Sequence, residues 1–185
     1  ATNYGWIRGW QSSTGDMIIS ADHSATGSGT SKSNLIFRSR GSETLRIDSG
    51  GRVLIGHSAS DTRHESGDAA LQVSGTAAAD SSIVAGRWSA DNQPAILELS
   101  KSRNGTIGSH TAVQADDIIG QINFAGDDGT RYLGAAFIKG IATSPIADYD
   151  CAGYLSFGTN YGTTSATERL RIDSTGHIHV KGSDH

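Results

Sequence analysis

A nine-residue segment, Glu-x-Leu-Arg-Ile-Asp-Ser-x-Gly, occurs twice in this chain, at residues 43–51 and again 125 residues later at residues 168–176. Repetition of this kind is typical of architectures in which one supersecondary unit recurs along the chain. Each copy follows a Leu-x-Phe sequence and precedes a short apolar alternation, so the repeated unit is longer than the segment itself. We therefore expect the end of a first β-repeat unit over residues 1–56 and a complete second unit over residues 57–185.

The repeated segment is readily explained as structure. Its leucine and isoleucine alternate with arginine, which places apolar and charged side chains on opposite faces of a strand. The Asp-Ser-x-Gly that follows is typical of a turn, because aspartate bonds its own backbone and glycine adopts positive φ. The segment therefore predicts a salt-bridged strand and turn, with a binding site as the weaker alternative.

The rest of the chain predicts short strands separated by turns, and hence an all-β protein. The predicted strands lie at residues 17–19, 35–37, 45–47, 53–55, 71–73, 96–99, 118–124, 132–141, 155–157 and 178–180. Asn104-Gly105 and the Gly-Asp-Asp-Gly of residues 126–129 predict hairpin turns. The best candidate for a helical turn is residues 76–88.

Apolar residues are too scarce for an ordinary core. Leu, Ile, Val and Phe make up 35 of 185 residues, near the level below which chains struggle to fold alone, yet the net charge is only -4. We therefore expect a core shared between copies of the chain, with the single cysteine, Cys151, as a small buried residue. The acidic balance argues against nucleic acid, and no apolar run reaches the length of a membrane span.

Several stretches also occur, in the same order, in a known family. They lie at residues 70–75, 97–103, 111–114, 120–130 (Gly-Gln-Ile-Asn-Phe-Ala-Gly-Asp-Asp-Gly-Thr) and 168–174. Over residues 35–180 the chain resembles bacteriophage tail fibres and tailspikes, in the region that precedes a self-cleaving intramolecular chaperone. The resemblance implies an elongated, intertwined homotrimer on the virion tail, built as a triple β-helix or from β-prism or sandwich elements. His185 is then either an autocleavage end or a boundary of the fragment.

His177 and His179 alternate on a predicted strand, so their rings share one face. Imidazole suits Fe, Ni or Zn, and three such pairs around a trimer axis would offer six ligands. The resemblance supports this site, since trimeric phage fibres hold axial metal ions with His-x-His pairs. The alternative is that Ile178 and Val180 face the core, which turns both histidines toward solvent.

Aromatic residues are the candidates for recognition. The resemblance implies binding of a host capsular polysaccharide or lipopolysaccharide, and sugars stack on aromatic rings. The candidates are Tyr4, Trp6, Trp10, Trp88 and Tyr161. The alternative is that these rings fill the shared core.

We expect a non-catalytic structural and receptor-binding module. Neighbouring carboxylates invite a glycosidase interpretation, which needs two carboxyl groups across one substrate. The pairs are Asp116 with Asp117, Asp127 with Asp128, and Asp148 with Asp150, and turn formation explains each more simply. The alternatives left open are a fragment of a glycan-degrading tailspike and a bacterial surface fibre.

Overall fold

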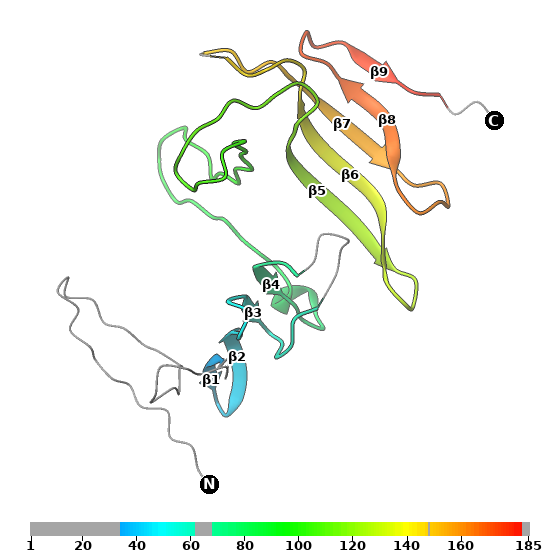
Figure 1. Cartoon of the computed structure of the whole chain (residues 1–185). Coiled ribbons are helices and arrows are strands. Elements are labelled where there is room, and N and C mark those ends of the chain that lie inside the picture. Colours follow the sequence, from blue (N-terminus) through cyan, green and yellow to red (C-terminus); the bar gives the residue numbers. More distant parts are fainter. Residues whose placement is uncertain (1–33, 62–67, 148, 183–185) are drawn as a thin grey trace, which may run out of the picture. The chain divides into compact units, whose positions relative to one another are not determined.

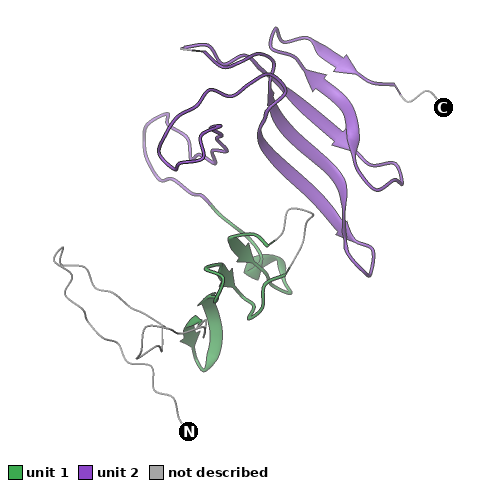
Figure 2. Cartoon of the chain, viewed as in Figure 1, with its two compact units in different colours: residues 1–84 green, residues 85–185 purple. Residues whose placement is uncertain are grey.

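The computed structural model describes residues 34–61, 68–147 and 149–182. The chain divides into two compact units, residues 1–84 and 85–185 (Figure 2). The described residues contain nine β-strands, one 3-10 turn and no α-helix, which confirms the all-β prediction. None of their helical segments is long and apolar enough to cross a membrane.

The first unit holds a four-stranded sheet (Figure 1). Its strands are β1 (Leu35–Ser39), β2 (Ser42–Ile47), β3 (Val53–Ile55) and β4 (Leu71–Val73). The first three form an antiparallel meander, and β4 lies parallel to β3. Arg40 and Gly41 connect β1 to β2 with φ of 51° and 83°, the combination that a two-residue hairpin turn requires. The turn η1 (Ala78–Asp80) lies inside the segment predicted to contain a helical turn.

The first compact unit, residues 1–84, extends beyond residue 56, where the sequence repeat places the end of the first repeat unit. Because β4 pairs with β3, residues after position 56 belong to the first sheet. Repetition in sequence and compactness in space are different criteria, so the repeat boundary between residues 56 and 57 stays a prediction.

The second unit holds a five-stranded antiparallel sheet with its strands in chain order (Figure 1). The strands are β5 (Ile118–Asp127), β6 (Tyr132–Ala142), β7 (Gly153–Thr159), β8 (Thr167–Ile172) and β9 (Ile178–Val180). The predicted hairpin between β5 and β6 is confirmed. The Asp128 N–H donates to the carbonyl of Arg131, and Gly129 has φ of 93°.

Two local predictions in this unit are wrong. Residues 96–99 form no strand and pair with no strand among the described residues, although Leu99 lies against Gly120 of β5. Asn104-Gly105 forms no two-residue hairpin turn either. It lies instead in a longer loop, in which the Arg103 N–H donates to the carbonyl of Thr111 over 3.2 Å and Gly108 adopts positive φ.

The sequence repeat is also a structural repeat, because β1–β2–β3 and β7–β8–β9 share the same pairing. Both copies pair the leucine and phenylalanine of the first strand with the isoleucine and leucine of the second. The pairs are Leu35–Ile47 and Phe37–Leu45 in one copy, and Leu155–Ile172 and Phe157–Leu170 in the other. A bulge follows the phenylalanine in each copy. The repeated unit is therefore a three-stranded antiparallel meander.

Residues directly opposite each other share a face, and this pairing builds apolar rows on one face of each sheet. The row of the second sheet has one residue from each strand: Ile122, Ile138, Phe157, Leu170 and Val180. The first sheet has two such rows, Phe37–Leu45–Ile55–Val73 and Leu35–Ile47–Val53–Leu71. Ile122 is 44% exposed and Val180 is 75% exposed.

The core of a single chain is correspondingly small. Among the described residues, four hydrophobic side chains are buried: Leu54, Val113, Ile141 and Ala142. Eighteen large hydrophobic residues of the same ranges are exposed. Cys151 is also exposed, so its predicted burial is wrong.

Candidate functional site

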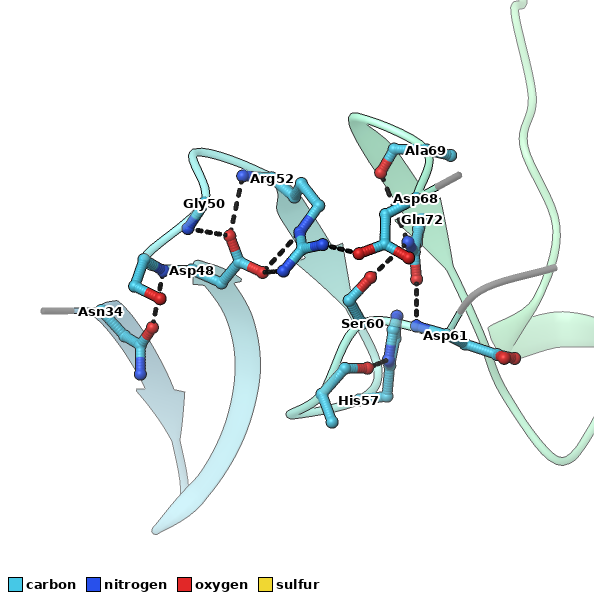
Figure 3. A network of polar contacts seen from close by, with 12 residues as sticks. Asn34, Asp48, Gly50, Arg52, His57, Ser60, Asp61, Asp68, Ala69 and Gln72 are labelled. Atoms are coloured by element: carbon cyan, nitrogen blue, oxygen red, sulfur yellow. Dashed lines mark hydrogen bonds and ion pairs between the residues drawn. The ribbon is translucent and has the colours of Figure 1, made fainter. Parts of the chain in front are cut away.

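The first copy of the repeated segment is a salt-bridged turn, as predicted, and Figure 3 shows the pair of Asp48 with Arg52. Arg46 donates from Nε and Nη2 to the two carboxylate oxygens of Glu43, over 2.7 and 2.8 Å. Asp48 accepts through Oδ1 from the N–H groups of Gly50 and Arg52, and through Oδ2 from Arg52 Nε at 2.7 Å. These bonds, led by the one from the Arg52 side chain, lower the pKa of Asp48 to about 2.

The same arginine links the turn to the chain that leads into β4. Arg52 also pairs with Asp68, beside the buried amide of Gln72 (Figure 3). Gln72 accepts from the Asp61 N–H at 3.0 Å and donates to Ser60 Oγ at 3.0 Å. This network ties the turn after β2 and residues 60–61 to β4 and the residues before it.

The second copy repeats the carboxylate–arginine pair. Glu168 accepts from Arg171 Nη2 at 3.0 Å, Ser156 Oγ at 2.7 Å and Lys181 Nζ at 3.0 Å. Burial alone would raise the pKa of Glu168, but these three donors outweigh it and lower that pKa to about 2. The Arg171 guanidinium lies 3.9 Å from the ring centroid of Tyr154. This cluster occupies the face opposite the apolar row and stabilises β7 against β8.

Both predicted metal ligands, His177 and His179, lie beside Asp173. Nε2 of His179 is 2.8 Å and Nδ1 of His177 is 3.6 Å from Oδ2 of Asp173. The hydrogen bond with His179, together with bonds from Thr175 and from the His177 backbone, holds the pKa of Asp173 well below its usual range. Within a single chain, the described residues contain no group of three His, Cys, Asp or Glu side chains placed for a metal. A site shared between chains stays a prediction.

Strand register separates these histidines from the apolar row. Ile178 pairs with Ile172 and Val180 pairs with Leu170, which places both on the apolar face. His179 pairs with Arg171 and therefore lies on the opposite, polar face. This is the arrangement of the alternative interpretation, in which the isoleucine and valine point toward the core.

Trp88 lies on a loop of the second unit. Its indole is 91% exposed. Arg87 donates from Nη2 to Asp91 Oδ2 at 2.6 Å and from Nη1 to the carbonyl of Gln93 at 2.7 Å. Asp91 in turn accepts from Ser89 Oγ and from the Gln93 N–H. The loop is thus fixed by its own polar contacts. Tyr4, Trp6 and Trp10 lie outside the described residues.

Tyr161 lies on the loop that connects β7 to β8, and its ring is 72% exposed. The Cζ atom of Arg169 is 5.2 Å from the centroid of that ring. Asn160 holds the loop, because its Oδ1 accepts from the N–H groups of Gly162 and Thr163. Sequence reasoning selected Tyr161 but missed Asn160 and Arg169. The sequence did carry a signal for this loop, because the second copy of the repeat is longer here than the first.

Two of the paired carboxyl groups are ill suited to act as a general acid. Asp117 accepts from Arg103 Nε at 2.6 Å and pairs with Lys101 at 3.0 Å, which keeps its pKa well below the usual range. Asp128 accepts from Thr130 and the Arg131 N–H, which lowers its pKa to about 2. A glycosidase acid needs a raised pKa instead. Asp148 lies outside the described residues.

Comparison with known proteins places the fold in a class. No protein family and no curated protein matches the chain at the level of sequence. Among solved structures, the fold is that of the carboxy-terminal domains of phage tail fibres, which confirms the predicted resemblance.

The particular match is to the bacteriophage T5 L-shaped tail fibre. Its carboxy-terminal domain aligns over 82% of this chain with a TM-score of 0.60 and 14% identity. A second structure, of that domain with its intramolecular chaperone domain, aligns over 77% of this chain with a TM-score of 0.57 and 15% identity. The chain spans 66% and 41% of the lengths of these two structures, and at this identity the likeness concerns the fold.

Proposed function

We propose that this chain is a structural segment of a phage tail fibre, assembled on the virion tail as a homotrimer that binds host surface glycans. The observation that carries the proposal is the exposed apolar face of both sheets, in a chain with a tail fibre fold. Such a face needs a partner, and we assign it to further copies of the same chain.

The apolar rows supply the energy for assembly. Each fully buried Leu, Ile, Val or Phe side chain contributes about 1.5–3 kcal/mol relative to an exposed one. The five-residue row of the second sheet spans all five strands, with 44% exposure at Ile122 and 75% at Val180. Large apolar patches of this kind mark interaction surfaces. A core shared between copies also accounts for the low apolar content of the sequence.

The segment at residues 96–99 supports intertwining of the copies. Ile96 is 70% exposed and Leu97 is 80% exposed, and the segment pairs with no strand among the described residues. An exposed segment with unpaired backbone groups can add as a strand to the sheet of another chain, and its β-type apolar residues favour a strand. We assign that sheet to a neighbouring copy, so that this strand forms only in the assembly.

Light scattering of the purified protein tests the assembly. The expected mass is three times the 19.3 kDa of one chain, unchanged on dilution through the micromolar range. A stable, compact monomer would contradict the proposal. Metal analysis of the same sample tests whether His177 and His179 hold a Fe, Ni or Zn ion on the trimer axis.

Adsorption to host cells tests the glycan-binding part. The labelled trimer should bind cells that carry capsule or lipopolysaccharide and should lose binding after these polysaccharides are stripped. We further propose that the segment is not catalytic, as the low pKa of Asp117 and Asp128 supports. A reducing-end assay on the same polysaccharide should then show no increase, whereas new reducing ends would favour the depolymerase alternative.

A further inference from the structure

The two copies of the repeated meander differ at one connection. In the first copy, Arg40 and Gly41 form a two-residue turn between β1 and β2. In the second copy, residues 160–166 connect β7 to β8, since Thr159 pairs with Thr167. The pairing on either side is the same, so the second copy carries a longer loop on an unchanged scaffold. Loops that vary on a rigid scaffold are where binding residues concentrate.

The longer loop has a fixed conformation that depends on Asn160. Its Oδ1 accepts from the N–H groups of Gly162 and Thr163 at 2.9 and 2.7 Å. Its Nδ2 donates to the carbonyl of Gly134 in β6 at 3.0 Å and to that of Thr163 at 2.7 Å. The Asn160 N–H also donates to the carbonyl of Ala135. One side chain therefore joins the loop to the neighbouring strand, and the loop is preorganised for binding.

The loop presents an aromatic ring beside a cation. Tyr161 is 72% exposed, and Arg169 lies over its ring at 5.2 Å. Arg169 occupies the bulge of β8, because Gly158 pairs with Glu168 and Phe157 pairs with Leu170. Whereas Arg46, Arg52 and Arg171 all pair with carboxylates, Arg169 has no carboxylate partner among the described residues.

An exposed aromatic ring beside such a guanidinium is suited to bind an acidic sugar. An unpaired guanidinium is a ready partner for a carboxylate, which it binds with two parallel hydrogen bonds. An exposed aromatic ring packs against the C–H face of a sugar, and hydroxyl groups such as those of the exposed Thr164 and Ser165 bond to sugar hydroxyls. A neutral sugar would offer no anionic partner to the Arg169 guanidinium, so the site favours an acidic sugar.

We propose that residues 160–166, together with Arg169, form a binding site for an acidic sugar residue of a bacterial surface polysaccharide. The sugar packs on Tyr161, and its carboxylate pairs with Arg169. Asn160 is a positioning residue, which fixes the loop but contacts no ligand. The inference rests on the proposed glycan-binding function and assigns it a site and a sugar chemistry.

The test uses the 185-residue chain and a panel of immobilised bacterial capsular polysaccharides that contain uronic acid. Each polysaccharide is paired with its carboxyl-reduced derivative, which keeps the sugar ring and loses the charge. The variants are Tyr161→Ala and Arg169→Gln. Arg131→Gln is the matched control, since it removes one positive charge from the β5–β6 turn of the same sheet. Melting curves and light scattering establish that each variant folds and assembles as the wild type does.

The expected result has two parts. Arg169→Gln should weaken binding of the acidic form by about tenfold or more, the loss typical of a charge-assisted hydrogen bond, and should abolish the preference for acidic over reduced polysaccharide. Tyr161→Ala should weaken binding of both forms, whereas Arg131→Gln should leave both unchanged.

Three outcomes would overturn the inference, and only the first of them also contradicts the proposed glycan-binding function. If the wild type binds none of the polysaccharides, the proposed glycan function fails with it. If the wild type binds but both loop variants bind equally well, the site is elsewhere and the function stands. If Arg131→Gln and Arg169→Gln cause equal losses, general charge and not this site governs binding.

Discussion

His179 places its Nε2 atom 2.8 Å from Oδ2 of Asp173, in the turn that ends the second copy of the repeat. In the first copy, Arg52 occupies that role at Asp48, with its Nε 2.7 Å from Oδ2. Two turns with the same backbone hydrogen bonds therefore pair their aspartate with different side chains, an arginine in the first copy and a histidine in the second.

Acid should weaken the first turn. The pKa of Asp48 is about 2 in the fold, below an ordinary value near 3.9, so its contribution to stability is present above about pH 4. That contribution is lost as the pH falls from about 4 to about 2. Asp48→Asn should lower the melting temperature at pH 7 and have a smaller effect at pH 2, as measured by calorimetry. Equal effects at both pH values would contradict this assignment.

Removing a buried hydroxyl should loosen the carboxylate cluster. Ser156 is 1% exposed and donates to Glu168 over 2.7 Å, so Ser156→Ala should lower the free energy of unfolding by about 1 kcal/mol. It should also raise the pKa of Glu168, which acid titration of the melting temperature can detect. Ser174→Ala, in an exposed turn, is the control and should have no effect.

A side chain at the turn glycine should strain the backbone alone. Gly176 has φ of 88° and open space where a Cβ atom would lie, so Gly176→Ala should cost roughly 1–2 kcal/mol from conformation. Gly126 also has open space but no positive φ, so Gly126→Ala is the matched control. Denaturant unfolding of both variants gives the comparison. A similar loss in each would mean that φ is not the cause.

A charge on the apolar row should disrupt assembly. Ile122 belongs to the row, and its neighbour Gln121 points to the opposite face. Ile122→Asp should shift the protein toward monomer in light scattering, because a carboxylate cannot be buried unpaired at low cost. Gln121→Asp introduces the same group on the polar face and should remain assembled. Assembly of both variants would place the interface elsewhere.

Hydrogen exchange should reveal the strand that the single chain lacks. Residues 96–99 pair with no strand among the described residues, so their amides should exchange rapidly in a monomer and slowly in the assembly. Mass spectrometry of the wild type and of Ile122→Asp provides both states. Rapid exchange of this segment in the assembled protein would count against intertwining.

Much of the local structure could be read from the sequence. Alternation predicted strands at positions such as residues 118–124, and Gly-Asp-Asp-Gly predicted the turn after them, because both signals depend on neighbouring residues only. The strand predicted at residues 96–99 failed in a single chain for the opposite reason. A strand needs a partner, and local sequence does not say where the partner lies.

The candidate site was only partly predictable. Tyr161 could be chosen because it is an aromatic residue in a polar loop. Arg169 occupies the same bulge position as Thr44 of the first copy, and the contact with the Tyr161 ring distinguishes it. The roles of Asn160 and Ser156 depend on strands β6 and β8, which are distant in sequence.

The sequence by itself determined the all-β class, the repeated unit and the salt-bridged turn, since each follows from side-chain alternation and turn chemistry over a few residues. Tertiary structure decided which residues share a face of each sheet. Strand register aligned Ile122, Ile138 and Phe157 with residues far along the chain and set His179 on the opposite face. Register depends on pairing between distant segments, and that pairing turns scattered apolar residues into a continuous surface.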